Sequence, residues 1–189
     1  MREAVGEAMP GGLVVRAITY AAAATHVAKV HRHLPGSPPR VQIRACFGAY
    51  RGARLRAVAI LGNPVSPHHN DALEVRRLAS DGAWGACSAL YLACLSETAR
   101  QGKARMVTYI FASESGRSCE VAGGVRVEVG PQGVDTRKGR KNLTRGVRKV
   151  RYDWVISGPL PVERQCDLFT TGPPCPDLSQ PRAPVTAGR

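Results

Sequence analysis

Apolar and polar positions alternate along the chain in short blocks that predict strands separated by helices. The blocks predict strands at residues 13–18, 41–47, 55–61, 73–79, 106–111, 125–129 and 147–155. Helices are expected at 20–33, 85–101 and 114–121. The segment 48–53 predicts a longer loop that joins its two neighbouring strands as an antiparallel hairpin. This order of elements, β-α-β-β-β-α-β-α-β-β, indicates an α/β (α+β) protein.

Composition divides the 189 residues into one domain and two flanking segments. We expect a flexible leader at 1–11, a domain at 12–156 and a disordered tail at 157–189. Half of the fourteen prolines lie from Pro159 onward, where large apolar residues are few. No apolar run is long enough to span a membrane, and no clean signal peptide is present. A cytoplasmic protein is therefore expected.

Residues 73–116 are the most informative segment, because they predict a strand, a glycine-containing loop, a helix and a second strand. The free N–H groups at such a helix start form an anion site. Small residues in the loop 82–88 let the backbone approach a pyrophosphate, and the hydroxyl of Ser88 adds a further donor. The alternative is a simple strand-to-helix turn in which Asp81 caps the helix.

The residues of this segment resemble a known superfamily. The stretches in question are Leu73-Glu74-Val75-Arg76-Arg77-Leu78, Asp81-Gly82, Ala86-Cys87-Ser88, Thr108-Tyr109 and Ala112-Ser113-Glu114-Ser115-Gly116. Together with the element order, they are similar to the GNAT acyltransferase fold and, within it, to the phage and prophage Mom-like subgroup. His31-x-His33 before a proline-bearing loop fits the same subgroup. Gly85 stands where close relatives tend to carry Asn, and Gly124 where an aromatic residue is expected.

The resemblance implies a mixed, largely antiparallel sheet that is split at its centre, between the strands at 73–79 and 106–111. It implies acetyl-CoA, or another acyl-CoA, bound in that split, with its pantetheine arm along 73–79. The implied cofactor-binding residues are Leu78, Gly82, Ala83, Trp84, Gly85, Ala86, Cys87 and Ser88. The usual loop signature, Arg/Gln-x-x-Gly-x-Gly/Ala, is matched loosely by Gly82 and Gly85-Ala86. Mom proteins modify adenine in phage DNA to an acetamido-type derivative, which blocks host restriction, and are thought to use acetyl-CoA and iron.

Four residues are candidates for catalysis: Glu74, Tyr109, Ser113 and Glu114. Glu74 interrupts an apolar strand edge and suits a general base or a metal ligand, although pairing with a neighbouring Arg in solvent is the alternative. The hydroxyl of Tyr109 suits protonation of a thiolate leaving group, or it only lines the pocket. Ser113 and Ser115 suit either the site or a helix cap, with Ser115 favoured as the cap.

A metal site is implied by His31, His33 and Glu74, in which a histidine and a carboxylate would bind iron. Two histidines two residues apart face different sides of a helix, so they can share a metal only where the helix has ended. The alternative is a basic helix end. We expect His68 and His69, in a polar loop, to be solvated. The six cysteines contain no C-x-x-C pair, which argues against a zinc cage.

The net charge of +13 indicates polyanionic partners, or a basic surface kept for solubility and ordinary Arg usage. Residues 137–151 hold eight Lys or Arg and no acid. We expect this segment to bind a nucleic-acid backbone through Arg137, Lys138, Arg140, Lys141, Arg145, Arg148 and Lys149. The alternative is a solvated loop. A base modified within double-stranded DNA must also be extruded.

Together these features predict a GNAT-like enzyme that uses acetyl-CoA to modify bases of DNA, with a role in phage anti-restriction. One alternative is an N-acetyltransferase of a small amine or protein, for which the charge is incidental. The other is a non-catalytic DNA-binding protein on a decayed GNAT scaffold.

Overall fold

The computed structural model describes residues 8–9, 12–31, 36–66, 69–128 and 148–156. The expected leader at 1–11 and tail at 157–189 thus lie almost wholly outside the described residues. Within them the elements, in chain order, are β1 (Ala8–Met9), β2 (Leu13–Ala17), α1 (Tyr20–Val30), the 3-10 turn η1 (Arg40–Gln42), β3 (Ile43–Arg51), β4 (Arg54–Gly62), β5 (Ala72–Ser80), α2 (Ala86–Arg100), β6 (Arg105–Phe111), α3 (Arg117–Val121), β7 (Val125–Glu128) and β8 (Lys149–Val155).

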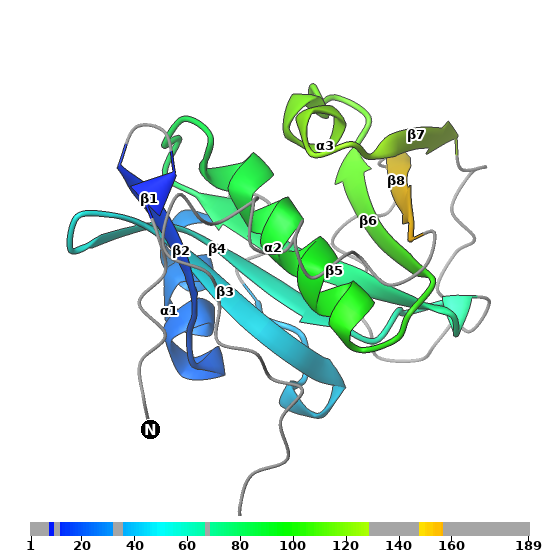
Figure 1. Ribbon diagram of the computed structural model, residues 1–189, viewed down its shortest axis with the longest axis horizontal. Coiled ribbons are helices and arrows are strands. Elements are labelled where there is room, and N and C mark those ends of the chain that lie inside the picture. The colour runs from blue at the N-terminus through cyan, green and yellow to red at the C-terminus, as the bar shows by residue number, and fades with distance from the viewer. Residues whose placement is uncertain (1–7, 10–11, 32–35, 67–68, 129–147, 157–189) are drawn as a thin grey trace, which may run out of the picture.

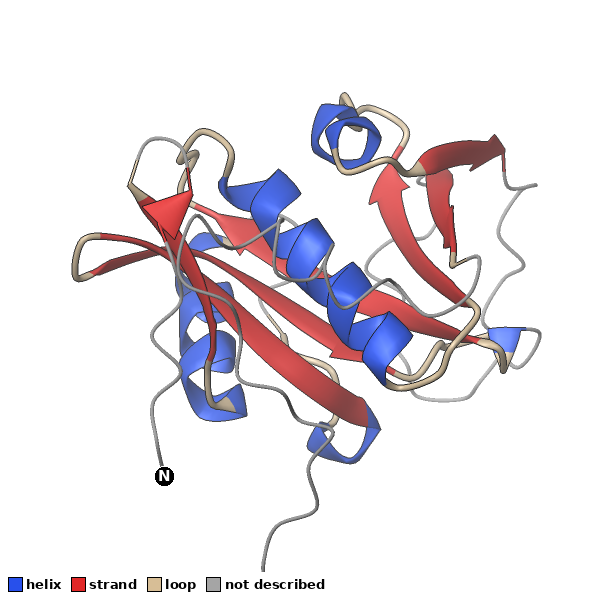
Figure 2. Ribbon diagram, in the orientation of Figure 1, coloured by secondary structure: helices blue, strands red, loops and turns tan. Residues whose placement is uncertain are grey.

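The strands form one sheet in the order β1-β2-β3-β4-β5-β6-β8-β7. Every neighbouring pair is antiparallel except β5 and β6, which are parallel. Helix α2 crosses one face of the sheet, while α1 packs on the other (Figure 1, Figure 2). The larger apolar core lies under α2, and a smaller core lies under α1. The predicted mixed, largely antiparallel sheet flanked by helices is confirmed.

The sheet is split at its parallel pair. β5 and β6 pair only along Ala72–Val75 and Arg105–Thr108, and beyond this point the two strands diverge (Figure 1). A register shift accompanies the divergence, because Ile60 of β4 pairs with Arg77 while the next residue, Leu61, pairs with Val75. Arg76 is therefore an extra residue in β5, and such a bulge bends a strand. The bulge lies where β5 turns away from β6.

Several predicted boundaries differ from the structure. The loop expected at 48–53 is a tight turn, since β3 and β4 stay paired up to Arg51 and Arg54. Gly48 lies inside β3, paired with Val58. An added Cβ there would lie 2.8 Å from Cδ1 of Leu55, so side-chain packing, and not a turn, favours glycine at this position. The first helix ends at Val30, and the short helix begins only at Arg117, after Gly116 at φ +67°.

Gly124 makes room for the indole of Trp154. An added Cβ at Gly124 would lie 2.6 Å from Cζ2 of Trp154. The buried indole donates a hydrogen bond of 2.8 Å to the carbonyl of Ala122 and stacks on Tyr91, with ring centroids 5.3 Å apart. Gly124 thus stands where an aromatic residue is expected, and Trp154 of β8 fills the space beside it.

Replacing Gly124 with Ala should lower the free energy of unfolding by about 1–3 kcal/mol, because the added methyl group overpacks a filled site. Urea denaturation measures the change. Gly36→Ala is the matched control, since a Cβ there meets nothing within 4 Å. Equal stability of Gly124→Ala and the wild type would contradict the packing role of Gly124.

Candidate active-site cleft

A cleft of about 920 Å³ opens where β5 and β6 diverge. It is bounded by residues from the end of α1, the diverging parts of β5 and β6, the starts of α2, α3 and β8, and the turn before α3. The cleft brings together eight residues that the sequence singled out: His31, Glu74, Leu78, Cys87, Tyr109, Ser113, Glu114 and Lys149. Residues far apart in the sequence therefore share one site.

Glu74 is a buried carboxylate in this cleft, with 7% of its surface exposed. Its Oε2 accepts a hydrogen bond of 2.9 Å from the N–H of Val65, and its Oε1 lies 3.6 Å from Nε of Arg76. Burial raises the pKa of Glu74, and the Val65 hydrogen bond and nearby cations oppose that rise only in part. A carboxyl group with a raised pKa is suited to accept a proton from a reacting group.

Three cations surround Glu74: Arg76, Arg77 and Lys149. The guanidinium of Arg77 donates to the carbonyls of Gly36 and Arg76, at 3.0 and 2.6 Å. Burial lowers the pKa of both Arg77 and Lys149. Within the described part of the chain, neither of these two side chains has a carboxylate within 4.0 Å. This end of the cleft is therefore rich in positive charge.

Tyr109 lines the cleft and contacts His69. Its Oη lies 3.3 Å from Nε2 of His69, while Nδ1 of the same ring lies 3.2 Å from Nη2 of Arg105. Burial raises the pKa of Tyr109. The expectation of a solvated His69 is wrong, because its ring is half-buried between these two partners. His68 lies outside the described residues.

One edge of β5 is open to the cleft. Residues 77–80 pair only with β4, and residues 109–111 of β6 pair only with β8. Near the split, Thr108 Oγ1 donates to the carbonyl of Val75 at 3.1 Å. Leu78 and Tyr91 border the same space and give it an apolar wall. An extended chain with amide groups could pair with this edge.

The loop between β5 and α2 has glycines in the left-handed region, Gly82 at φ +92° and Gly85 at φ +77°. Gly85 is the N-cap of α2, in a conformation that Asn also tolerates. Asp81 does not cap the helix. Its carboxylate accepts from the N–H of Ala83 at 3.2 Å and from Nε of Arg56 at 2.7 Å.

Other N–H groups of this loop are also engaged, since those of Gly82 and Ala86 donate to Ser80 Oγ and to the carbonyl of Ala83. Trp84 is 81% exposed at the tip. Of the eight residues expected to bind the cofactor, Leu78 and Cys87 border the cleft itself. Gly82, Ala83, Trp84, Gly85, Ala86 and Ser88 lie on the loop and first turn beyond it.

Ser113 and Glu114 lie in the turn after β6. Oε2 of Glu114 accepts a hydrogen bond of 3.0 Å from the N–H of Phe111, so this carboxylate holds the turn together. Gly116, and not Ser115, is the N-cap of α3, although Ser115 Oγ lies 3.4 Å from the N–H of Arg117. A structural role for Glu114 is therefore visible beside its place in the cleft.

The described residues do not fit an iron site. Both oxygens of Glu74 face donors, the N–H of Val65 and the guanidinium of Arg76. Among the described residues, no three His, Cys, Asp or Glu side chains gather as metal ligands. Of the predicted trio, His31 and Glu74 both border the cleft, while His33 lies outside the described residues.

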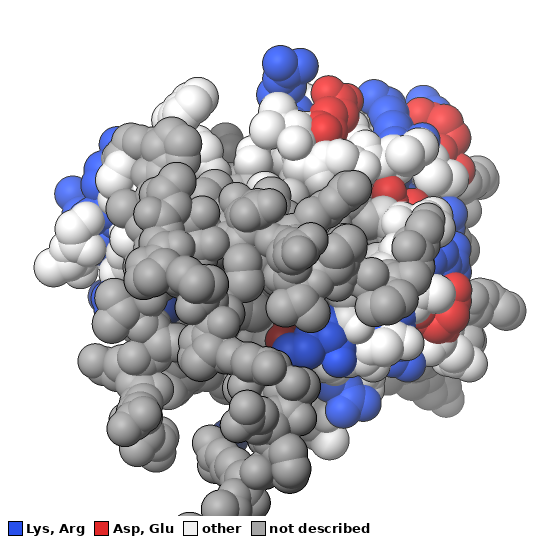
Figure 3. Space-filling model, viewed as in Figure 1, with Lys and Arg blue, Asp and Glu red and all other residues white. Residues whose placement is uncertain are grey.

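Most of the predicted nucleic-acid-binding residues, Arg137, Lys138, Arg140, Lys141 and Arg145, lie outside the described residues. Arg148 pairs with Glu128 at 2.9 Å, and Arg126 pairs with the same carboxylate at 3.2 Å. Along the upper and right-hand edge of Figure 3, basic and acidic side chains lie next to each other. Lys149 differs from Arg148, because it borders the cleft and adds a positive charge there.

Comparisons with known proteins relate the chain to acetyltransferases by structure. The protein yncA of Salmonella typhimurium, solved with its cofactor acetyl-CoA, superposes with a TM-score of 0.57 and 14% identity, covering 80% of this chain and 99% of that one. An N-acetyltransferase of Staphylococcus aureus Mu50 gives 0.52 and 12%, with coverage of 77% and 99%. A GNAT-family acetyltransferase of Streptococcus pneumoniae gives 0.52 and 13%, with coverage of 76% and 99%.

No protein-family model and no curated protein sequence matches this chain. The protein therefore has the GNAT acetyltransferase fold, at identities that define a fold and leave the substrate open. None of its described helices is both long enough and apolar enough to cross a membrane. The predicted split and the resemblance to the GNAT fold are confirmed, while the Mom-like subgroup stays a prediction.

Replacing Glu74 with Gln should raise the melting temperature at about pH 8 and change it little near pH 4. Because burial raises the folded-state pKa of Glu74, the neutral form is favoured by folding, and stability is lost as pH rises through that pKa. Gln keeps an acceptor for the N–H of Val65 and carries no charge. Thermal denaturation of both proteins across this pH range measures the effect. A wild-type advantage that grows with pH would contradict a desolvation-dominated Glu74.

Proposed function

We propose that this protein transfers an acyl group from acyl-CoA to an amine in the cleft between β5 and β6. The observation that carries the proposal is the buried Glu74 at the point where the parallel strands diverge. The base Glu74, the acid Tyr109 and an open strand edge border the same space. These are the parts that amide formation from a thioester requires.

The described residues fit an acyl-CoA. The open edge of β5 at 76–80 suits the amides of the pantetheine arm, and Leu78 lies on the apolar side of that edge. Gly82 and Gly85 let the backbone at the start of α2 approach a pyrophosphate. The N–H groups of Gly82, Ala83 and Ala86 are engaged within the loop, so the pyrophosphate contacts would come from the remaining first-turn amides and Ser88.

Acetyl-CoA supplies an acetyl group as a thioester. Glu74 accepts the proton of the attacking amine as the C–N bond forms, and its raised pKa makes it a stronger proton acceptor than an exposed carboxylate. Tyr109 donates its hydroxyl proton to the thiolate as the C–S bond breaks. The proton on Glu74 then returns to the phenolate of Tyr109 through solvent, which restores both groups and leaves an amide and free CoA.

The acceptor that we propose is a base of DNA, adenine first, as in the Mom-like phage and prophage proteins that counter restriction. Two observations support an anionic acceptor: the net charge of +13, and the cluster of Arg76, Arg77 and Lys149 around Glu74. Cations beside the base would hold a phosphate next to an extruded nucleotide. Since the described residues do not fit iron, simple acyl transfer is the proposed chemistry.

Two other functions are outcomes of the same test. A small amine or protein acceptor would use the same Glu74, and the positive charge would then be incidental. One observation favours a DNA-binding protein without catalysis. Three loop N–H groups donate to acceptors within the loop, and Asp81 is acidic, so a pyrophosphate would be bound less tightly there.

Incubation of the purified protein with acetyl-labelled acetyl-CoA and double-stranded DNA should produce a labelled adenine nucleoside in mass spectrometry. Glu74→Gln should reduce this product by about 10²–10⁴-fold, the usual contribution of a general base. Label transferred to small primary amines but not to DNA would replace the DNA proposal with the first alternative. No loss of label from CoA with any acceptor would overturn the enzymatic function.

A further inference from the structure

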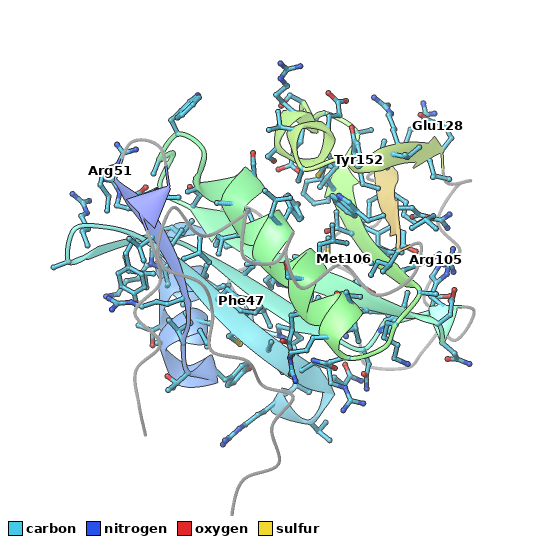
Figure 4. All side chains as sticks on the ribbon, viewed as in Figure 1. Phe47, Arg51, Arg105, Met106, Glu128 and Tyr152 are labelled. Atoms are coloured by element: carbon cyan, nitrogen blue, oxygen red, sulfur yellow. The ribbon has the colours of Figure 1, made fainter. Side chains whose placement is uncertain are left out.

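His69 connects the cleft to an ion-pair network on the β6–β8 face. Its ring lies between Oη of Tyr109, 3.3 Å from Nε2, and Nη2 of Arg105, 3.2 Å from Nδ1. Arg105 and Met106 are neighbours in β6 and point to opposite sides in Figure 4, with Met106 towards α2 and Arg105 away from it. The His69 contacts thus lie on the face opposite α2.

Arg105 determines which nitrogen of His69 carries the proton. A guanidinium only donates hydrogen bonds, so Nδ1 must accept. Arg105 is held in place by two bonds to Asp71, 2.8 Å from Nε and 2.9 Å from Nη2, and it lies 3.7 Å from Asp153. An imidazolium has no nitrogen that can accept, so the contact with Arg105 requires a neutral ring. Burial and the charges of Arg151 and Arg105 favour the same form, because they lower the pKa of His69. The single ring proton is therefore on Nε2.

With its N–H on Nε2, His69 donates to Oη of Tyr109, and the hydroxyl proton of Tyr109 must point elsewhere. We propose that His69 is a positioning residue that turns the Tyr109 proton into the cleft, toward the leaving thiolate. The proposal rests on the proposed acyl transfer. It adds His69 and Arg105 to the site, of which the sequence predicted only Tyr109.

The same bond stabilises the product of proton donation. Once Tyr109 has given up its proton, the phenolate keeps a donor in the Nε2–H of His69 and a nearby positive charge in Arg151. Hydrogen bonds to the charged form lower the pKa of an acid. His69 therefore orients the proton, and its hydrogen bond also counteracts the rise that burial causes in the pKa of Tyr109.

The tautomer can be read directly, without activity, by ¹⁵N NMR of histidine-labelled full-length protein, with His69 assigned by His69→Gln. We expect an unprotonated Nδ1 and a protonated Nε2 at neutral pH. A protonated Nδ1, or an imidazolium, would overturn the proposal whatever the enzyme's activity. This measurement keeps the inference separate from the proposed function.

Kinetics then test the role, with CoA release measured on the acceptor that the labelled-acetyl experiment identifies. His69→Leu should lower kcat for acetyl-CoA by about 10–100-fold, and His69→Gln, whose amide N–H replaces Nε2–H, should recover part of the loss. With an aryl thioacetate, whose thiolate leaves without protonation, the loss should fall below about 3-fold.

The double variant His69→Leu, Tyr109→Phe should be no slower than Tyr109→Phe alone, because both act on one proton. Additive losses, or an equal loss with both thioesters, would show that His69 only maintains structure. A wild-type protein that releases no CoA would instead remove the proposed function, and the NMR result would still decide the tautomer.

Discussion

The structure depends on the early end of the parallel pairing between β5 and β6. Only four residues of β5, Ala72–Val75, pair with β6. If the two strands stayed paired along their full length, the open edge of β5 and the cleft beside it would be lost. The bulge at Arg76 is the local device that turns the strand away, and Glu74 lies just before it.

The divergence leaves backbone groups of both strands without strand partners, and side chains compensate in part. Thr108 Oγ1 donates to the carbonyl of Val75, and the guanidinium of Arg77 donates to the carbonyl of Arg76. Glu74 is buried at the same point, where three cations offset only part of its desolvation. A carboxyl group kept at this cost is more consistent with a role in chemistry than with a role in stability.

Apart from β1 and the turn η1, the order of strands and helices could be predicted because it rests on local patterns of apolar residues. The place of Glu74 and Tyr109 beside the cleft could be predicted through a short resemblance around the split strands. The contact of His69 with Tyr109 could not, since 40 residues separate them and a histidine in a polar loop carries no signal of its partner. Residue type alone places Gly48 in a loop, since its close approach to Leu55 is set by strand packing and leaves no mark in the local sequence.

The loop before α2 illustrates the limit of reading a motif by its residue types. Its glycines have the expected left-handed conformation, but Asp81 and Ser80 engage two of the N–H groups that an anion would use. Residue identity predicted the shape of the loop, whereas the hydrogen-bond partners depend on neighbours such as Arg56, which holds Asp81 from β4.

Hydrogen exchange of the full-length protein with and without acetyl-CoA tests the central claim most directly. If the split between β5 and β6 holds an acyl-CoA whose pantetheine arm pairs with β5, amides within 76–80 should exchange more slowly when acetyl-CoA is bound. Amides of β3, which lies two strands away, should be unaffected and serve as the internal reference. Protection confined to another surface, or none at saturating acetyl-CoA, would contradict the account.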